Sequence, residues 1–347
     1  MGLSLGLLIF SFIVTSVLIV PFINILYKLR LTRRKEAPQK GQGKVSEFDK
    51  MHDWKAGTPV GGGILIVFLV SVIFALVFPL VSRLGVFISA AYNIDAEVKI
   101  IFFTFLSFAL LGLYDDLIKL FGKPKPGRQG MFFGLTRKYK FTLQWVLAGV
   151  ISFLIYKNLG ITIIHVPLLD RVLELGWWYI PFSTFVIVYF VNAVNITDGL
   201  DGLATGLLLV CLFAFWILAA SVFDTPLSLF ISLWIGALIA FLYFNIWPAR
   251  IFLGDSGSLA FGATLAVVGL LTGKIFTLLV IGGLFAAEAL TSLIQILGWR
   301  VLQRPIFPIA PLHLWFQLRG WEEPKIVMRA WLAGVVLAIF GLWLAVI

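Results

Sequence analysis

Long apolar stretches set the first limit on what this chain can fold into. An α-helix needs roughly 20 mainly apolar residues to cross a bilayer, and stretches of that length recur from end to end. Of the 347 residues, 61% are hydrophobic and 13% are charged, against roughly 25% charged in soluble domains. We therefore predict an all-α integral membrane protein, with one polytopic domain over residues 1–347. The ten predicted spans are 3–27, 60–82, 99–118, 141–161, 178–194, 203–222, 227–246, 256–273, 275–298 and 328–346.

The basic residues predict the orientation of these helices. All but five of the 27 Lys and Arg residues fall in loops that the ten spans place on one side. Cytoplasmic loops retain Lys and Arg, so we expect these loops in the cytoplasm and both termini outside. The same placement accounts for the net charge of +10 without a nucleic-acid partner. The five exceptions are Arg83, Lys99, Lys157, Arg171 and Lys274.

Three clusters of aspartates lie at span ends on the predicted cytoplasmic side. Asp115 and Asp116 close the third span, at a helix C-terminus, where the helix dipole disfavours acids. Asp198 and Asp201 lie in a glycine-rich turn, and Asp255 precedes the eighth span. Asp255 suits a helix N-cap or a ligand of Mg²⁺, which usually takes one or two carboxylates. Charges near a membrane are costly unless they are paired, ion-bound or hydrated, so we predict a single polar site.

Other polar residues extend this prediction. Lys55, Lys119 and Lys140 suit the binding of a diphosphate, and carboxylates beside lysines favour phosphoryl transfer. His313 has two open readings, a structural one and a binding one. Glu288, deep in the ninth span, marks either a function or a buried polar contact.

Taken together and in this order, the motifs resemble those of the polyprenyl-phosphate hexosamine-1-phosphate transferase superfamily. The segments Lys55–Gly63 and 134–144 favour its phospho-N-acetylmuramoyl-pentapeptide transferase branch. The resemblance implies transfer of phospho-N-acetylmuramoyl-pentapeptide from UDP to undecaprenyl phosphate, which yields lipid I and UMP for peptidoglycan synthesis. It also implies Mg²⁺, a cleft on the cytoplasmic face of the bacterial inner membrane, and a possible homodimer.

The resemblance also assigns roles to individual residues. Asp255 matches the magnesium ligand, and Asp115 and Asp116 match the pair linked to binding and deprotonation of the lipid phosphate. These three are the expected catalytic residues. The expected substrate-binding residues are Lys55, Thr58, Lys119, Lys140, Asn195, Asp198, Gly199, Leu200, Asp201, Asn245, Phe252 and His313.

The chain departs from the family pattern before its last helix. The family carries three consecutive histidines and a glutamate there, whereas this chain reads His313-Leu314-Trp315-Phe316-Gln317. Val60-Gly61 also replaces a Thr-Met pair. These changes affect the part of the pattern tied to nucleotide and sugar selectivity, and the aspartate positions are unchanged.

Other interpretations stay open at this point. The related transferases that use UDP-GlcNAc share the aspartate clusters, and an ion-coupled transporter would account for Glu288. However, transporters often show internal repeats and midplane charges, whereas these carboxylates lie at helix ends. A nonenzymatic scaffold leaves the aspartates unexplained. For the transferase, direct attack by the lipid phosphate competes with a two-step route through an aspartyl-phosphate on Asp115 or Asp116.

Overall fold

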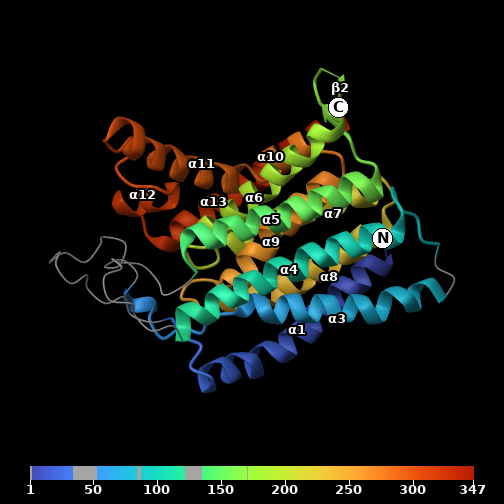
Figure 1. The fold of residues 1–347 in the computed structure, drawn as a ribbon. Helices are drawn as coiled ribbons and strands as arrows, with labels where there is room; N and C mark the ends of the chain where they lie inside the picture. Colours follow the sequence, from blue (N-terminus) through green and yellow to red (C-terminus); the bar gives the residue numbers. More distant parts are fainter. Residues whose placement is uncertain (1, 34–52, 84–86, 122–134, 170) are drawn as a thin grey trace.

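A computed structural model describes residues 2–33, 53–83, 87–121, 135–169 and 171–347 (Figure 1). Within these residues the fold is a bundle of α-helices with one short β-hairpin. The helices are α1 (Gly2–Lys28), α3 (Gly62–Arg83), α4 (Ile94–Phe121), α5 (Arg137–Leu154), α6 (Tyr179–Thr197), α7 (Leu203–Ser221), α8 (Thr225–Asn245), α9 (Asp255–Leu271), α10 (Ile275–Ile281), α11 (Gly283–Leu297), α12 (Leu312–Leu318) and α13 (Glu323–Val346). The antiparallel hairpin pairs β1 (Ile163–Val166) with β2 (Arg171–Glu174).

The prediction of an all-α membrane protein is confirmed. In the described part of the chain, nine helices are long and apolar enough to cross a membrane. Each predicted span coincides with a helix, but two differ from the prediction. The eighth span, α9, has only 17 residues, and the ninth is divided at Gly282 into α10 and α11. The hairpin and α12 were not predicted, because short segments lack the long apolar pattern of a span.

Helix α9 lies at the centre of the bundle. Every residue from Ser256 to Leu271 is buried, and α9 packs against α4 and α6. Small residues let helix backbones approach closely inside a membrane, as where Gly257 of α9 meets Gly63 of α3. The first residue of this central helix is Asp255, so the packing fixes the position of that carboxylate.

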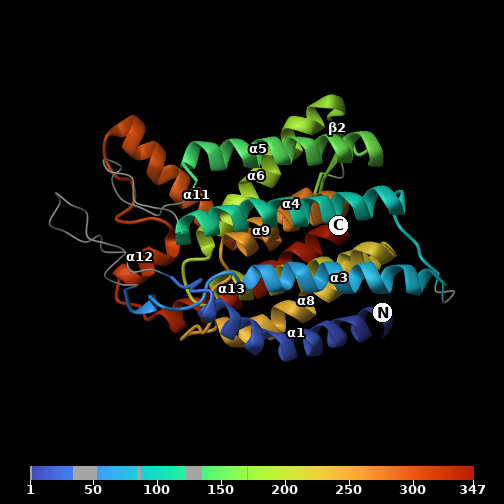
Figure 2. The same cartoon turned by 60° about the horizontal axis from the view of Figure 1, so that its bottom comes forward.

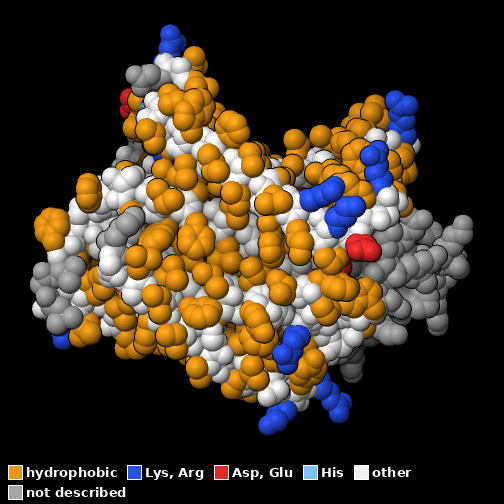
Figure 3. Space-filling view, turned by 180° about the vertical axis from the view of Figure 1, so that it is seen from behind, with side chains coloured by type: hydrophobic (Ala, Val, Ile, Leu, Met, Phe, Trp, Pro, Cys, Tyr) orange, Lys and Arg blue, Asp and Glu red, His pale blue; other side chains and the backbone are white. Residues whose placement is uncertain are grey.

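The two termini lie at the same end of the bundle in both ribbon views (Figures 1 and 2). Helix α4 runs from that end to the opposite one, where its Asp115 and Asp116 meet the start of α9. Hydrophobic side chains cover most of the face in Figure 3, with Lys and Arg gathered mainly toward one end. This distribution is that of a multi-pass membrane protein.

Candidate active site

Asp116 binds the N-terminus of α9. Its carboxylate accepts hydrogen bonds from the backbone N–H groups of Asp255 (3.1 Å) and Ser256 (2.9 Å). These amides would otherwise lack partners, and the helix dipole favours a negative charge beside them. The close approach requires Gly112 on α4, because a Cβ there would lie 2.1 Å from the carbonyl oxygen of Asp255. An acidic residue at the C-terminal end of α4 is therefore explained by the helix start that it contacts.

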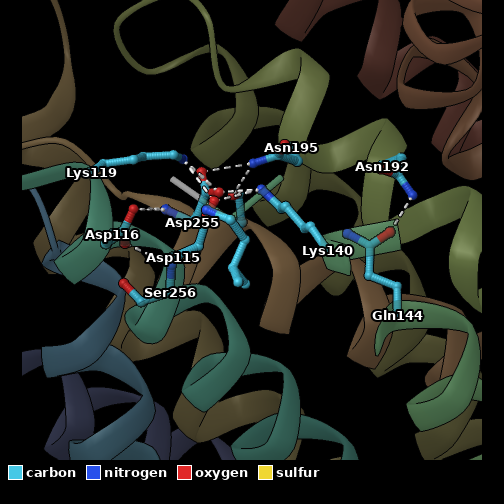
Figure 4. A network of polar contacts seen from close by, with 11 residues as sticks. Asp115, Asp116, Lys119, Lys140, Gln144, Asn192, Asn195, Asp255 and Ser256 are labelled. Atoms are coloured by element: carbon cyan, nitrogen blue, oxygen red, sulfur yellow. Dashed lines mark hydrogen bonds and ion pairs between the residues drawn. The ribbon is translucent and has the colours of Figure 1, made fainter. Parts of the chain in front are cut away.

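Asp115 and Asp255 share two lysines (Figure 4). Lys119 Nζ lies 3.0 Å from Asp115 and 2.7 Å from Asp255. Lys140 Nζ lies 3.1 Å from Asp115 and also contacts Asp255. The second oxygen of Asp115 accepts the backbone N–H of Leu135 (2.7 Å). Both lysines keep part of their surface exposed, 25% and 18%, whereas the carboxylates are almost buried.

Asn195 connects the α6 end of the site to the start of α9. Its amide donates to Asp255 (3.2 Å) and to the hydroxyl of Ser258 (2.8 Å). One helical turn earlier, Asn192 donates to Gln144 of α5 (2.9 Å). Polar contacts thus join helices α4, α5, α6 and α9 around Asp255. The structure brings together these residues of the predicted site: Asp115, Asp116, Lys119, Lys140, Asn195 and Asp255.

Asp198 adds a carboxylate to this cluster. It is half-buried and, within the described residues, its carboxyl group has no hydrogen bond or ion pair. Burial, with the nearby charges of Asp255 and Asp116, raises its pKa well above the ordinary value. The cluster thus holds four carboxylates, Asp115, Asp116, Asp198 and Asp255, beside the two lysines Lys119 and Lys140. When all six side chains are ionised, the described cluster has a formal excess of two negative charges.

A second ion-pair cluster involves Lys55, Asp201 and Glu323. Lys55 Nζ lies 2.6 Å from both carboxylates, and the lysine is 1% exposed. Asp201 also accepts the backbone N–H of Ala249 (2.9 Å). Lys55 and Asp201, which we assigned to substrate binding, are thus paired inside the protein. Glu323 was not predicted as a site residue, because an acidic residue before a proline at a helix start has the pattern of an ordinary helix terminus.

His313 contacts Glu288 and also the turn Asp198–Asp201 between α6 and α7, which we call the aspartate turn. Its backbone N–H and its ring Nδ1 each lie 3.1 Å from the Glu288 carboxylate. Since an ionised carboxylate only accepts hydrogen bonds, this contact suits the tautomer with the proton on Nδ1. The opposite ring nitrogen faces Gly199, where an added Cβ would lie 2.6 Å from Nε2. Glu288 is therefore a buried polar contact that orients His313 against the turn next to Asp198.

The remaining predicted residues shape the loops around these clusters. Asn245 is buried, accepts the Thr205 hydroxyl (2.8 Å) and donates to the Ile251 carbonyl (2.9 Å). Leu200 is 3% exposed. Phe252 is partly exposed beneath the Arg33 guanidinium, at 6.0 Å, and the carbonyl of Thr58 accepts the Arg33 backbone N–H at 2.9 Å. All of these lie at the site end of the bundle.

The family described as glycosyl transferase family 4 matches residues 98–273, which hold Asp115, Asp198 and Asp255. The chain is 35% identical over 338 residues to the phospho-N-acetylmuramoyl-pentapeptide-transferase of Geobacillus thermodenitrificans, covering 97% of this chain and 96% of that one. The namesake proteins of Bacillus pumilus and Halalkalibacterium halodurans are 33% and 34% identical, covering 98% of this chain and 97% and 96% of theirs. The chain belongs to the phospho-N-acetylmuramoyl-pentapeptide-transferase family.

Proposed function

We propose that this protein transfers phospho-N-acetylmuramoyl-pentapeptide from its UDP carrier to undecaprenyl phosphate, forming lipid I and UMP for peptidoglycan synthesis. The observation that carries the proposal is the sharing of Lys119 and Lys140 by Asp115 and Asp255 at the capped start of α9. In phosphoryl transfer, catalysis comes mainly from positioning and from charges placed where the phosphates react.

The two lysines have the role of holding phosphate groups. They come from different helices, α4 and α5, and their ammonium groups meet at one point beside Asp255. Phosphate oxygens of the donor would replace part of the carboxylate contacts of these lysines. The charge developing on the departing UMP would then be stabilised by fixed ammonium groups.

The carboxylates of the site suit Mg²⁺. Four aspartates lie beside two lysines, and Asp198 has no hydrogen bond or ion pair in the described chain. No group of three or more His, Cys, Asp or Glu among the described side chains is arranged to hold a metal ion. Mg²⁺ usually needs only one or two carboxylates, with phosphate and water completing its shell. Asp255 and Asp198 are the proposed ligands, and the ion would supply charge neutralisation on the diphosphate.

The contacts of Asp115 and Asp116 favour direct attack over an aspartyl-phosphate. Both oxygens of Asp116 accept amides at the start of α9, and both oxygens of Asp115 have donors. Either residue would have to lose these contacts to act as a nucleophile. A lipid phosphate is already largely ionised at neutral pH, because its second pKa is about 6. In the direct route its oxygen forms a bond to the β-phosphorus as the bond from that phosphorus to the bridging oxygen breaks, which releases UMP.

The position of the site suits an acceptor with a phosphate headgroup and a long apolar tail. The site lies at one end of the helix bundle, away from the chain termini (Figure 1). We place this end at the cytoplasmic face of the bacterial inner membrane, where the soluble donor and the lipid meet. The whole chain then acts as one polytopic domain.

The test is transfer by purified protein with Mg²⁺ and undecaprenyl phosphate, with UDP-MurNAc-pentapeptide and UDP-GlcNAc offered in parallel. We expect lipid product from the muramoyl donor alone. Product from UDP-GlcNAc alone would contradict the proposed donor, and product from neither would contradict the proposed function.

A further inference from the structure

Three cations at the start of α13 and the end of α12 rest on tryptophan rings. Lys325 Nζ lies 5.1 Å and Arg329 Cζ lies 4.5 Å from the ring centre of Trp321. Arg319 lies 4.7 Å from the ring centre of Trp315. A ring face attracts a cation and restricts its position, but it carries no net charge that would neutralise it. We call these five residues the cationic face.

The cationic face is one continuous surface. Phe316 of α12 stacks on Trp321 with ring centres 4.8 Å apart, which joins the end of α12 to the start of α13. Lys325 and Arg329 are one helical turn apart and point to the same side. The side chains of Lys325, Arg329 and Arg319 are all exposed.

This face keeps its positive charge. Among the described residues, none of its three cations forms an ion pair with a carboxylate. Glu323 is buried and paired with Lys55, so the exposed acid in this segment is Glu322. Three cations against one exposed carboxylate define a site for anions.

An exposed apolar stripe of α13 continues from the cations. Met328, Leu332, Val336, Ile339 and Trp343 are between 52% and 68% exposed and follow helical spacing on the side of Lys325. In a membrane helix such a stripe contacts acyl chains. Lys325 and Trp343 are about 27 Å apart along the axis at ~1.5 Å per residue, close to the ~30 Å of the hydrocarbon core. The cations therefore lie at the level of the lipid headgroups.

We propose that the cationic face binds the headgroups of anionic phospholipids, with the acyl chains lying along the exposed stripe of α13. The phosphate would be held by the outward N–H groups of Arg319, Lys325 and Arg329. The tryptophans would lie at the interface, where their amphipathic rings are favoured. This lipid is a neighbour of the enzyme in the bilayer and is distinct from its polyprenyl acceptor.

The test measures phosphatidylglycerol bound to the purified full-length protein in micelles of a neutral detergent by native mass spectrometry. The variant combines Arg319→Gln, Lys325→Gln and Arg329→Gln, and we expect affinity to fall on the order of tenfold or more, because each cation near an anionic surface contributes separately. The matched control combines Lys99→Gln, Lys157→Gln and Arg171→Gln, which removes three exposed cations elsewhere, and we expect it to bind like the wild type. Trp321→Leu keeps all charges, and we expect a smaller loss from it.

Unchanged phosphatidylglycerol binding in the triple variant would overturn the proposal and leave an acidic protein as the remaining partner. An equal loss of phosphatidylglycerol affinity in the control variant would show that only the net charge of the protein matters, and this result would also overturn the proposal. A raised KM for undecaprenyl phosphate with phosphatidylglycerol binding intact would assign the face to the acceptor instead. Where the triple variant fails to fold, the double variant Lys325→Gln and Arg329→Gln, which keeps the contact of Arg319 with Trp315, tests the proposal by the same criteria.

Discussion

The Glu288 carboxylate lies 3.1 Å from both the backbone N–H and the ring Nδ1 of His313, residues that belong to α11 and α12. This contact fixes a helix of only seven residues next to the aspartate turn. It also gives the intramembrane acid a partner inside the protein, which removes the main reason for an ion-coupled transporter.

Replacing Glu288 by leucine leaves the buried His313 donors without an acceptor. A buried unsatisfied donor costs about 1–3 kcal/mol, so we expect a lower Tm and weaker transfer, with Glu288→Gln retaining part of both. A double-mutant cycle with His313→Ala measures the coupling, which should exceed about 0.5 kcal/mol for residues in contact. Additive effects of the two substitutions would contradict the pairing.

Lys55→Met removes the cation from the buried cluster and leaves Asp201 and Glu323 facing each other. Breaking a buried ion pair by removing one partner costs about 3–5 kcal/mol. We expect a large loss of thermal stability, followed by loss of activity. Adding Glu323→Gln should restore part of the stability, because one uncompensated charge is removed. A stable Lys55→Met variant that has lost only donor affinity would instead show that Lys55 acts on the substrate.

Gly112→Ala tests the close contact between α4 and α9. The new Cβ would lie 2.1 Å from the Asp255 carbonyl oxygen, so the start of α9 must shift. We expect at least a tenfold lower kcat, because small misplacements of reacting groups are costly. Gly149→Ala is the matched control, since a Cβ at Gly149 meets no atom within 4 Å. Equal activity of the two variants would contradict the crossing geometry.

Asp198→Asn tests the proposed magnesium ligand. The Mg²⁺ concentration for half-maximal activity should rise roughly tenfold, because the site loses a charge and a ligand. The pKa of Asp198 is raised, so its carboxyl group takes up a proton at a higher pH than an ordinary aspartate. The Mg²⁺ requirement of the wild type should therefore increase as pH falls through that pKa, and Asp198→Asn should flatten this dependence. The control is Asp95→Asn, at an exposed position. If the Mg²⁺ concentration for half-maximal activity is unchanged in Asp198→Asn, Asp198 is not a ligand of the ion.

The helices and the placement of the aspartates at one end of the bundle could both be predicted from the apolar stretches of the sequence. Apolar stretches of membrane-spanning length define the helices, and counting them places Asp115, Asp198 and Asp255 at one end. What could not be predicted depends on packing between distant segments. No periodicity pairs Glu288 with His313 or Lys55 with Glu323. The division of the ninth span at Gly282 is likewise hidden in a stretch that is apolar throughout.

The residues predicted for the site fall into two groups. Some have side chains that converge at one point, and others form contacts that stabilise the surrounding loops. Asp255, Lys119 and Lys140 converge, as their placement at helix ends indicated. Asn245 was assigned to the substrate from the resemblance, yet its amide is used within the protein. A polar residue in a motif has the same sequence pattern in either role, and only the contacts distinguish them.

The most direct test of the central claim compares two buried aspartates in one transfer assay. Asp255 lies in the carboxylate–lysine cluster, whereas Asp224 is 2% exposed and caps α8 at a distance from it. With UDP-MurNAc-pentapeptide, undecaprenyl phosphate and Mg²⁺, we expect Asp255→Asn to lower the rate of lipid I formation by on the order of 10³-fold, as for loss of a main electrostatic group. Asp224→Asn should keep most of the wild-type rate once folded protein is normalised. An Asp255→Asn variant within tenfold of the wild type would contradict the account.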